Sequence, residues 1–427
     1  MQAPQCGPCA TPVPVGGHHP DVVAGLVENP GEDVDALGFD AVVIGYEESQ
    51  RFPLPVGPHD AAGVVPPVGG ATSLAHRGEH RVTCRCRWRN AARWHRMVAR
   101  TTGGDMADGE DHDHVWVAAR GLRFPEGPVW ADDATLVVTE IAAGTLSGVD
   151  PATGLVSVLV SSLPGPNGMA RSPKGTDWVW VCDNGGYFTW FDTGSVLVPG
   201  PPASDHRGGS LRHLPLNRGA GEPLVVDRCD GESLVAPNDL VLDANGGVWF
   251  TDFGVQHDTE VAGRPGVGYL APGANEATGV VWGTHQANGV GLSVDGSELY
   301  VAETHSGSLW AFDVVGPGRV ADGGAPLTGH GGRLVHRAEG RMFDSLAVDP
   351  DGWVCVATIG PGGGVTCVHP STGEVRHVTA PDDLTTNVCF TPDDGGAVRA
   401  ALTLSSIGAV GVIADWRAVR DATPALG

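Results

Sequence analysis

The stretch NDLVLDANGGVWFTD, residues 238–252, contains the unit that decides the fold. A polar head, Asn238, precedes a short apolar strand, a turn rich in Asp, Asn and Gly, and a second strand rich in Val, Trp and Phe. Short apolar runs on either side of a Gly-containing turn predict two antiparallel strands joined as a hairpin. The head stands eight residues before the turn residue Gly246.

The same unit recurs along the chain with the same internal spacing. The other heads, each eight residues before its turn residue, are Glu126, Asn167, Asn288, Asp344 and Asn387. The turn residue is Gly in five units and Ala134 in the remaining one. An isolated Asn-Gly pair is more often a turn than a site, but turn chemistry alone does not account for six polar heads in register.

Six similar β-units with no helical pattern between them predict an all-β fold, a six-bladed β-propeller. The innermost strand of each blade would line a central channel, so the heads would converge as a ring at one mouth. Two carboxylates and up to four carboxamide oxygens are hard ligands, which suit Ca²⁺. The sequence therefore predicts a metal site in the channel. No His or Cys stands at a head position, which disfavours a dedicated zinc site.

Several motifs together resemble the SMP-30/gluconolactonase (regucalcin-like) family over about residues 115–416. They are RFPEGPVW, APNDLVLDANGGVWFTDFG, ANGVGLSVDGSELYVAET, FDSLAVDPDGWVCVAT and TTNVCF, in the family's order. The resemblance implies a six-bladed propeller with a divalent cation in its channel. It also implies an enzyme that opens sugar lactones, with distant relatives that hydrolyse organophosphates.

The resemblance also implies roles for individual residues. Glu126, Asn288 and Asp344 match metal ligands of the family, and Asn238 matches a residue that lies against the metal or the substrate. We expect Ca²⁺, with Zn²⁺ or Mn²⁺ as alternatives. Ala236 stands where some sugar lactonases carry an Arg that contacts the substrate, so contacts to sugar hydroxyls must come from elsewhere.

We expect the reaction to be hydrolysis of a lactone such as gluconolactone, with Asp344 as general base beside the ion. Metal ligation would lower the basicity of Asp344, which argues against that role. Two alternatives use the same ring: a metal-dependent esterase or phosphotriesterase, and a propeller that binds Ca²⁺ without turnover. Plant alkaloid-synthase-like propellers are a remote alternative, because this chain has the full ligand set.

Polar residues just beyond strands are candidates for substrate contact, although a turn-capping role is the more common one. They are Asp183, Asn184 and His257, and the channel heads Asn167 and Asn238 are candidates as well. A lone His after a strand, such as His305, is more often a loop residue than a proton shuttle. The strand ends at Asp252 and Glu303 are expected to serve blade geometry. Buried packing is the simplest role for the Trp residues at 130, 180, 249, 310 and 353.

Composition limits the partners of the chain. A formal net charge of −24 over 427 residues argues against nucleic acid and anionic membranes as partners. The family resemblance implies a small-molecule lactone as the partner. The chain has no apolar run long enough to span a membrane and no signal-peptide pattern. The cysteines from Cys182 onward lie mostly in apolar runs and do not form a disulfide framework. These features favour a cytoplasmic location. The oligomeric state is left open.

Residues 1–112 differ from residues 113–427, which we assign to the propeller. The first segment is rich in Pro and Gly without a period, so we expect a disordered extension, or a translation start placed too far upstream of Met106. CGPC at 6–9 lacks the strand and helix of a redox motif, and CxC at 84–86 is poor spacing for zinc. The Arg-rich run at 77–100, with eight Arg and one Glu, leaves a contact with nucleic acid as a minor alternative.

Overall fold

The computed structural model describes residues 112–173, 177–217, 221–257, 260–321 and 330–426. The segment before residue 112 lies outside the described residues. The expectations for CGPC at 6–9, the cysteines at 84 and 86, the run at 77–100 and a start at Met106 therefore stay predictions. So does the proposed boundary between residues 1–112 and 113–427.

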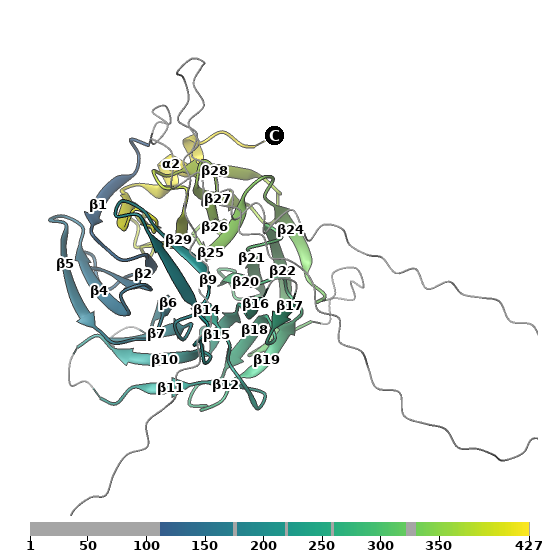
Figure 1. Cartoon of the computed structure of the whole chain (residues 1–427). Helices are drawn as coiled ribbons and strands as arrows, with labels where there is room; N and C mark the ends of the chain where they lie inside the picture. The colour runs from purple at the N-terminus through teal and green to yellow at the C-terminus, as the bar shows by residue number, and fades with distance from the viewer. Residues whose placement is uncertain (1–111, 174–176, 218–220, 258–259, 322–329, 427) are drawn as a thin grey trace, which may run out of the picture. The chain divides into compact units, whose positions relative to one another are not determined.

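Six antiparallel sheets stand around a central axis as the blades of a β-propeller (Figure 1). Blade 1 contains β2 (Pro125–Trp130), β3 (Leu136–Glu140), β4 (Thr145–Asp150) and β5 (Leu155–Val160). Blade 2 contains β6 (Pro166–Arg171), β7 (Trp178–Asp183), β10 (Ser210–Pro215) and β11 (Leu224–Val226). Blade 3 contains β14 (Pro237–Leu242), β15 (Val248–Asp252), β18 (Gly266–Leu270) and β19 (Thr278–Trp282).

The remaining blades repeat this order. Blade 4 contains β20 (Ala287–Leu292), β21 (Glu298–Glu303), β22 (Ser308–Gly316) and β24 (Arg333–Arg337), and β23 (Arg319–Val320) pairs with the end of β22. Blade 5 contains β25 (Met342–Val348), β26 (Val354–Ile359), β27 (Gly364–Val368) and β28 (Val375–Thr379). Blade 6 contains β29 (Thr385–Phe390), β30 (Ala400–Leu404), β31 (Ala409–Ile413) and β1 (Trp116–Arg120). The predicted six-bladed propeller is thus confirmed.

Blade 6 closes the ring by joining the two ends of the propeller sequence. Its outer strand, β1, comes before blade 1 in the chain and pairs antiparallel with β31, with Trp116 opposite Val412 and Arg120 opposite Ala409. The innermost strands contact one another in the closed order β2, β6, β14, β20, β25, β29 and back to β2. The first strand of each unit therefore lines the channel, as the repeat predicted.

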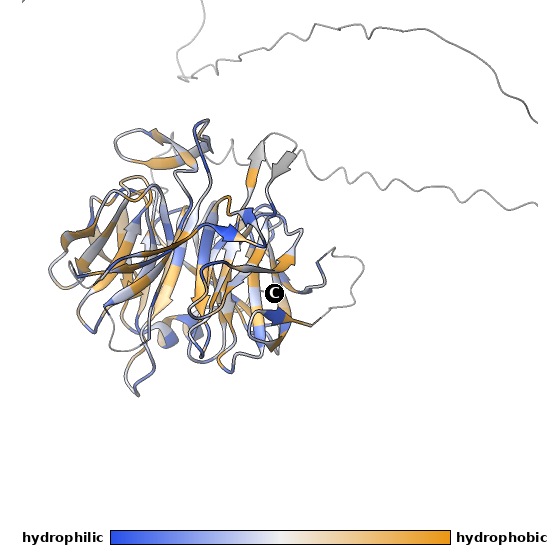
Figure 2. Cartoon of the chain, turned by 90° about the horizontal axis from the view of Figure 1, so that it is seen from below, coloured by the Kyte–Doolittle hydropathy of each residue, from blue (hydrophilic) through white to orange (hydrophobic). Residues whose placement is uncertain are grey.

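Apolar side chains fill the spaces between blades, and the blade strands carry many hydrophobic residues (Figure 2). A separate buried cluster lies between each pair of neighbouring blades; for example, Trp249 on blade 3 packs with Leu299 and Trp310 on blade 4. Trp130, Trp180 and Trp353 belong to equivalent clusters, which confirms the packing role expected for these Trp residues. The cysteines at 182, 229, 355 and 367 are free and buried, as expected, and that at 389 is free and half-buried.

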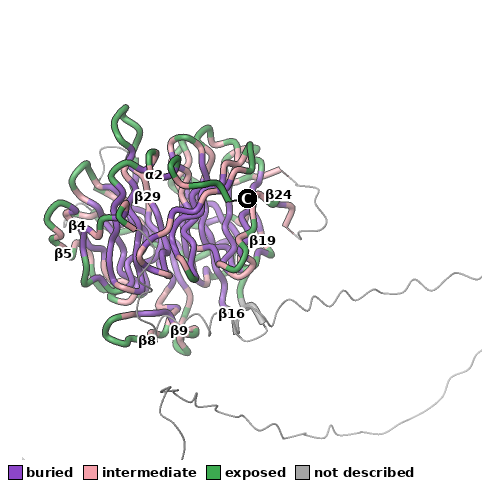
Figure 3. Tube along the Cα trace, turned by 90° about the horizontal axis from the view of Figure 1, so that it is seen from above, coloured by how far each residue is buried: buried purple, intermediate pink, exposed green. Residues whose placement is uncertain are grey.

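Two hairpins are inserted between the second and third strands of blades 2 and 3. They are β8 (Phe188–Asp192) with β9 (Leu197–Pro202), and β16 (Val255–His257) with β17 (Glu260–Ala262). Both leave the propeller on the same face, and β9 contacts β16 (Figure 3). The second strands end where the inner strands begin, since Pro125 pairs with Glu140 and Pro237 with Asp252. The inserted hairpins therefore stand at the channel mouth that carries the heads.

Two further elements connect or follow the blades. The short hairpin β12 (Arg228–Cys229) with β13 (Glu232–Ser233) connects blade 2 to blade 3. The helix α2 (Trp416–Ala422) follows blade 6, and Arg420 on it forms an ion pair with the buried Asp349 of blade 5. Within the described ranges, no helix is long and apolar enough to cross a membrane.

Candidate functional site

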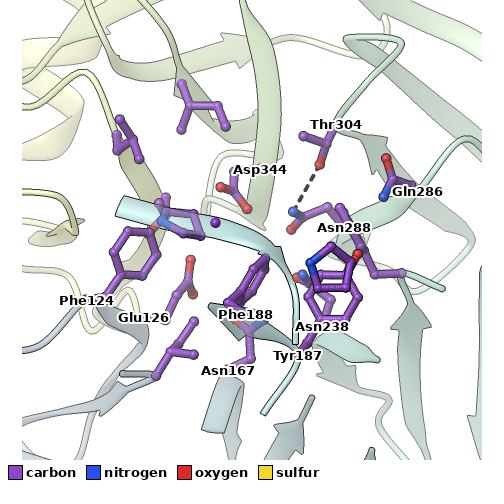
Figure 4. A pocket seen from close by; sticks show the side chains of 18 of the residues that line it. Phe124, Glu126, Asn167, Tyr187, Phe188, Asn238, Gln286, Asn288, Thr304 and Asp344 are labelled. Carbon is purple, nitrogen blue, oxygen red and sulfur yellow. Dashed lines mark hydrogen bonds between the residues drawn. The ribbon is translucent and has the colours of Figure 1, made fainter. Parts of the chain in front are cut away.

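Five of the six heads line one cavity of about 410 Å³ at the channel mouth. These heads are Glu126, Asn167, Asn238, Asn288 and Asp344, and all but the half-buried Asp344 are at most 6% exposed. They come from the inner strands of blades 1 to 5 and point toward a common space (Figure 4). The predicted convergence of the heads is therefore observed for these five residues.

A break in strand pairing at each head explains why the side chains enter the channel. The register between the first two strands shifts just after Glu126, Pro166, Pro237, Ala287 and Phe343. A β-bulge of this kind re-aims a side chain, and such bulges are common next to active sites. The heads are thus directed by backbone irregularities that recur in these blades.

Glycines after the heads allow neighbouring inner strands to approach closely. A Cβ atom on Gly127 would stand 2.6 Å from the carbonyl oxygen of Asn167, and one on Gly289 would stand 2.5 Å from the amide nitrogen of Leu346. Real side chains do not tolerate such distances. In addition, Thr139 of blade 1 donates a hydrogen bond of 2.8 Å to the carbonyl oxygen of Asn167. The ring is therefore compact because backbone packs directly against backbone.

The sixth head, Asn387, does not line the cavity but forms a hydrogen bond to a residue of the ring. Its Nδ2 donates a hydrogen bond of 2.7 Å to Oε2 of Glu126, which also accepts one of 2.6 Å from the amide of Gly127. Burial nevertheless raises the pKa of Glu126, against the effect of these hydrogen bonds. The Glu126 carboxylate is thus held in place, but its surroundings stabilise its negative charge poorly.

Asp344 shares this environment. Burial raises its pKa well above the usual range, and the nearby carboxylate of Glu126 raises it further. Its neighbour Asn288 is fixed by two hydrogen bonds: its Nδ2 donates to Thr304 Oγ1 at 3.1 Å (Figure 4), and its Oδ1 accepts from Ser345 Oγ at 3.4 Å. The negative charge of Glu126 therefore disfavours ionisation of Asp344 in the same ring.

A third acid beside the ring, Asp239, was not predicted as a site residue. It is 5% exposed, and its pKa rises to about 8 through burial and the nearby Glu126. Its carboxylate accepts hydrogen bonds from the amides of Leu240 at 2.9 Å and Val290 at 3.3 Å, which ties blade 3 to blade 4. The signal in the sequence was the acid that directly follows the head in the Asn-Asp pair.

These residues fit a divalent cation. The pKa values of Glu126, Asp239 and Asp344 are all raised, so their ionised forms are poorly stabilised, and a cation would favour those forms. Asn238 Oδ1 is buried, and no hydrogen-bond donor in the described part of the chain reaches it. Carboxylate and carboxamide oxygens are the ligands that Ca²⁺ takes. In the same ranges, no group of three or more His, Cys, Asp or Glu side chains could hold a metal ion, so carboxamides would have to contribute.

The structure does not bring Asp183 or Asn184 to the cavity. Asp183 is fully buried, forms an ion pair of 2.7 Å with Arg212, and accepts hydrogen bonds from the amides of Gly165 and Gly185. Asn184 Oδ1 accepts hydrogen bonds of 3.1 Å from the next loop, including the amide of Tyr187. We therefore assign these two residues to loop geometry, in place of the substrate contact expected from the sequence.

Asp183 follows a rule that holds in other blades. Asp252 ends β15 and accepts hydrogen bonds from the amides of Val235 and Ala236, which precede the head Asn238. Glu303 ends β21 and accepts one of 2.8 Å from the amide of His285, three residues before the head Asn288 of the same blade. The acid at the end of the second strand thus positions the approach to the inner strand. The role in blade geometry expected for Asp252 and Glu303 is confirmed.

The two histidines considered from the sequence have different outcomes. His257 ends β16, but its side chain is not among those that the structure describes, so a substrate contact stays a prediction. His305 lies in the cavity wall, and burial lowers its pKa to about 4. Its imidazole is therefore neutral at physiological pH, in a position that sequence reasoning treated as an ordinary loop.

Two further cavity residues, Phe124 and Gln286, were also missed. Each stands two residues before a head and has a positive backbone φ, 57° and 61° respectively. Such a conformation is uncommon for residues other than Gly and is often found at functional sites. Gln286 is 4% exposed, and its Oε1 has no hydrogen-bond partner among the described atoms. The sequence carried no signal for these backbone conformations.

Apolar side chains form most of the cavity wall above the ring. Phe188, Phe191 and Pro199–Pro202 come from the hairpin β8–β9, and Phe124, Ile141 and Leu384 come from blades 1 and 6. Ala236, which the family resemblance singled out, is buried in a cluster with Tyr187, Phe253 and Val255. The site therefore combines a polar floor with an apolar wall.

Comparison with known proteins agrees with this architecture. The model of the SMP-30/gluconolactonase/LRE-like region matches residues 124–407, more than half of the chain. The solved structure of a gluconolactonase from Xanthomonas campestris superposes with a TM-score of 0.52 at 22% identity, covering 70% of this chain and 89% of that one. A luciferin-regenerating enzyme superposes with a TM-score of 0.50 at 13% identity, covering 73% and 98%. These likenesses show the shared fold.

Curated relatives match part of the chain. A gluconolactonase of Zymomonas mobilis is 26% identical over 221 residues, which cover 47% of this chain and 55% of that protein. The lactonase drp35 of Staphylococcus haemolyticus is 28% identical over 251 residues, covering 58% and 66%. The chain thus spans less than two thirds of the length of these relatives. On the match to its family model, the chain belongs to the SMP-30/gluconolactonase/LRE-like family.

Proposed function

We propose that the protein is a lactonase that depends on a divalent cation, which we take to be Ca²⁺. The observation that carries the proposal is the ring itself. Buried Glu126 and half-buried Asp344, with raised pKa values, face the same cavity as the Oδ1 of Asn238, which no donor among the described residues reaches. The named activities of the gluconolactonase and lactonase relatives support lactone hydrolysis.

Glu126, Asn238, Asn288 and Asp344 would hold the ion, with Asn167 beside them in the cavity floor. When bound, a divalent ion polarises a carbonyl group and stabilises developing negative charge as a Lewis acid. The hydrogen bonds from Asn387 to Glu126 and from Asn288 to Thr304 fix two of the ligands before substrate arrives. Such preorganisation avoids rearrangement during the reaction.

We assign the proton transfer to Asp344. Its carboxylate would take a proton from water as the water oxygen bonds to the lactone carbonyl carbon. The bond between that carbon and the ring oxygen then breaks, and the proton passes to the ring oxygen to give the hydroxy acid. A positioned general base contributes about 10²–10⁴-fold to such a reaction. A ligand to the ion is a weaker base, so this role is the part of the proposal most exposed to test.

The neutral His305 lines the same cavity and is the second group that could exchange a proton with water there.

The sequence predicted a sugar lactone as substrate, and the gluconolactonase of Zymomonas mobilis supports a sugar lactone. The apolar wall favours a less polar lactone. We also propose a cytoplasmic location for the protein.

The proposal is tested by initial rates of acid release from a panel of γ- and δ-lactones. The full chain is assayed as isolated, after chelation, and after Ca²⁺, Zn²⁺ or Mn²⁺ is restored. We expect activity to be lost on chelation and recovered with one of the ions, and Asp344→Asn to reduce kcat by at least about 100-fold. Cation binding without turnover of any lactone would instead indicate a non-catalytic Ca²⁺-binding propeller. Turnover of aryl esters or phosphotriesters alone would indicate the esterase alternative.

A matched variant separates chemistry from folding. Asp295 lies in the exposed turn between β20 and β21, and hydrogen bonds from Ser293 and Ser297 hold its pKa at about 2. Asp295→Asn removes a carboxylate far from the cavity and should leave turnover unchanged. If Asp344→Asn binds the ion and still turns over at a near-normal rate, Asp344 is not the base.

A further inference from the structure

The hairpin β8–β9 makes the wall of the cavity apolar, whereas the floor of the cavity is polar. It is inserted between β7 and β10, whereas the corresponding connection in blade 1 runs only from Glu140 to Thr145. The hairpin supplies Phe188, Phe191 and Pro199–Pro202 to the cavity. These residues present carbon surface and, apart from their backbone, no polar group. The insertion therefore adds an apolar cover to a ring of polar heads.

The hairpin is held firmly over the channel. The amide of Leu197 on β9 donates a hydrogen bond of 2.8 Å to the carbonyl oxygen of Ser406 in blade 6. Arg123 of blade 1 forms an ion pair of 2.7 Å with Asp192 on β8. The ring of Phe124 packs against Trp190 with centroids 5.1 Å apart. Contacts with both blades 1 and 6 thus make the cover part of the folded site.

The apolar wall continues from the hairpin onto the propeller. Phe124, Ile141, Ile359 and Leu384 belong to one buried cluster with Leu197 and Val198 of β9, and Phe188 packs against it. Five of these residues also face the cavity: Phe124, Ile141, Phe188, Ile359 and Leu384. The cluster comes from blades 1, 5 and 6, so the apolar wall is continuous on that side of the channel.

Phe191 leaves apolar surface at the cavity exposed to water in the folded protein. Its side chain lies at the rim of the cavity and is 53% exposed. A large aromatic residue half open to water beside a cavity gains little for folding, and exposed apolar surface at a cavity often marks a binding site. A ligand group that covered Phe191 would remove this surface from water.

Most polar side chains of the cavity are the heads in its floor and residues of blade 4 beside them, although Tyr187, and Thr386 of blade 6, also line the cavity. Asn288, Thr304 and Gln286 come from the same blade, and Figure 4 shows Gln286 and Thr304 next to Asn288. No Arg or Lys is among the described residues that line the cavity. A polyhydroxylated ring would press hydroxyl groups against Phe188, Pro199 and Leu384, where side chains offer no hydrogen bond, and a buried hydroxyl without a partner is disfavoured.

From this division we infer that the lactones used here carry an apolar substituent, an alkyl chain or an aromatic ring, which lies beneath the β8–β9 hairpin against Phe188 and Phe191. The ester group of the lactone lies over the polar floor, and the Gln286 amide faces it. This inference rests on the proposed lactonase function and specifies its substrate class. Sugar lactones are accordingly poor substrates.

Three δ-lactones with the same six-membered ring test the inference: unsubstituted δ-valerolactone, δ-decalactone with its pentyl chain, and D-glucono-δ-lactone with its hydroxyl groups. Rates are corrected for spontaneous hydrolysis. A single methylene in a matching pocket is worth about tenfold or more in kcat/KM. We therefore expect δ-decalactone to exceed δ-valerolactone by at least about tenfold, and D-glucono-δ-lactone to fall below both.

The variant Phe191→Ser tests the placement under the hairpin. Because Phe191 is largely exposed, the variant should fold; it should lower kcat/KM for δ-decalactone by about tenfold through KM and leave δ-valerolactone unchanged. Leu155→Ser, at a residue of β5 that is 68% exposed and outside the cavity, is the control and should change neither rate.

The outcomes separate the inference from the function on which it rests. Faster turnover of D-glucono-δ-lactone than of δ-decalactone would overturn the inference while the lactonase function stands. Equal loss on all three lactones in Phe191→Ser would also overturn it, since the residue would then not select the substituent. No turnover of any of the three, with the ion bound, would contradict the lactonase function itself.

Discussion

Asn387 donates a hydrogen bond of 2.7 Å from its Nδ2 to Oε2 of Glu126, although 261 residues separate them in the chain. The bond joins the inner strand of the last blade to that of the first. It holds in place a carboxylate that is 2% exposed and has a raised pKa. One hydrogen bond therefore both helps to close the propeller and holds the proposed metal ligand Glu126 in place.

Removing this contact should weaken metal binding more than folding. Asn387→Leu keeps the size of the side chain but leaves Glu126 Oε2 without its side-chain donor. Hydrogen-bond partners of metal ligands typically contribute 10–100-fold to metal affinity. We expect the Kd for Ca²⁺, measured by calorimetry, to rise by about that factor. Asn245→Ala, in the exposed turn between β14 and β15, is the control. An unchanged Kd in folded Asn387→Leu would show that the bond does not prepare the ligand.

Stability of the metal-free protein should fall as pH rises through the neutral range. Asp239 has a pKa of about 8 in the folded state, against about 4 for an ordinary Asp. The folded state therefore binds more protons, so its extra stability is complete below about pH 4 and is lost as pH rises toward 8. The raised pKa values of Glu126 and Asp344 act in the same direction.

Buried histidines oppose this trend only at lower pH. The pKa values of His305 and His377 are lowered to about 4, so the free energy they cost falls away as pH rises to about 6.5. The test is therefore the urea midpoint of metal-free protein between pH 7 and 9. We expect a decline that saturating Ca²⁺ reduces and Asp239→Asn partly removes. A midpoint independent of pH over this interval would contradict the assignment of raised pKa values.

Closure by β1 should be essential to stability. Ala119 lies in β1 opposite Val410 of β31 and is 5% exposed, within the cluster between blades 6 and 1. Ala119→Asp buries a carboxylate without a partner, which should cost about 3 kcal/mol or more. Arg120→Ala changes the exposed next residue of the same strand and should cost under about 0.5 kcal/mol. Similar urea midpoints for the two variants would mean that β1 adds little to the closed ring.

The close approach of blades 4 and 5 gives a further prediction. A Cβ atom on Gly289 would stand 2.5 Å from the Leu346 amide nitrogen and 2.8 Å from the Asp344 carbonyl oxygen. Gly289→Ala should therefore move the inner strand that carries Asp344, cost about 1–3 kcal/mol, and reduce turnover. Gly396→Ala is the matched control, because Gly396 is exposed and a Cβ atom there meets only the Asp394 side chain, at 3.2 Å. Wild-type turnover in Gly289→Ala would show that the spacing is not critical.

The sequence predicted the repeated part of the fold because each blade has the same order of polar head, first strand, turn and second strand. The turn glycines Gly246, Gly296, Gly352 and Gly395 all have the positive φ that these hairpin turns require. A head at a fixed distance from such a turn must lie at the same height in every blade. The ring of heads could therefore be inferred from spacing alone.

The remaining features depend on what is not repeated. The hairpin β8–β9 has no counterpart in blade 1, so its aromatic residues had no register from which a place in the cavity could be inferred. Asp183 resembled a substrate contact because it follows a strand, yet its charge is matched by Arg212 on the neighbouring strand. Only pairing across the blade, which the linear sequence does not display, distinguishes these roles.

The most direct test of the account measures bound ion and turnover in the same sample. Metal-free full-length protein is titrated with Ca²⁺, and the rate of hydrolysis of a substrate lactone is followed together with the ion bound per chain. If the ring of Glu126, Asn238, Asn288 and Asp344 holds the catalytic ion, the rate rises in proportion to bound ion, saturates at one ion per chain, and stays near background in Glu126→Gln. Full turnover by protein that carries no ion would contradict the account.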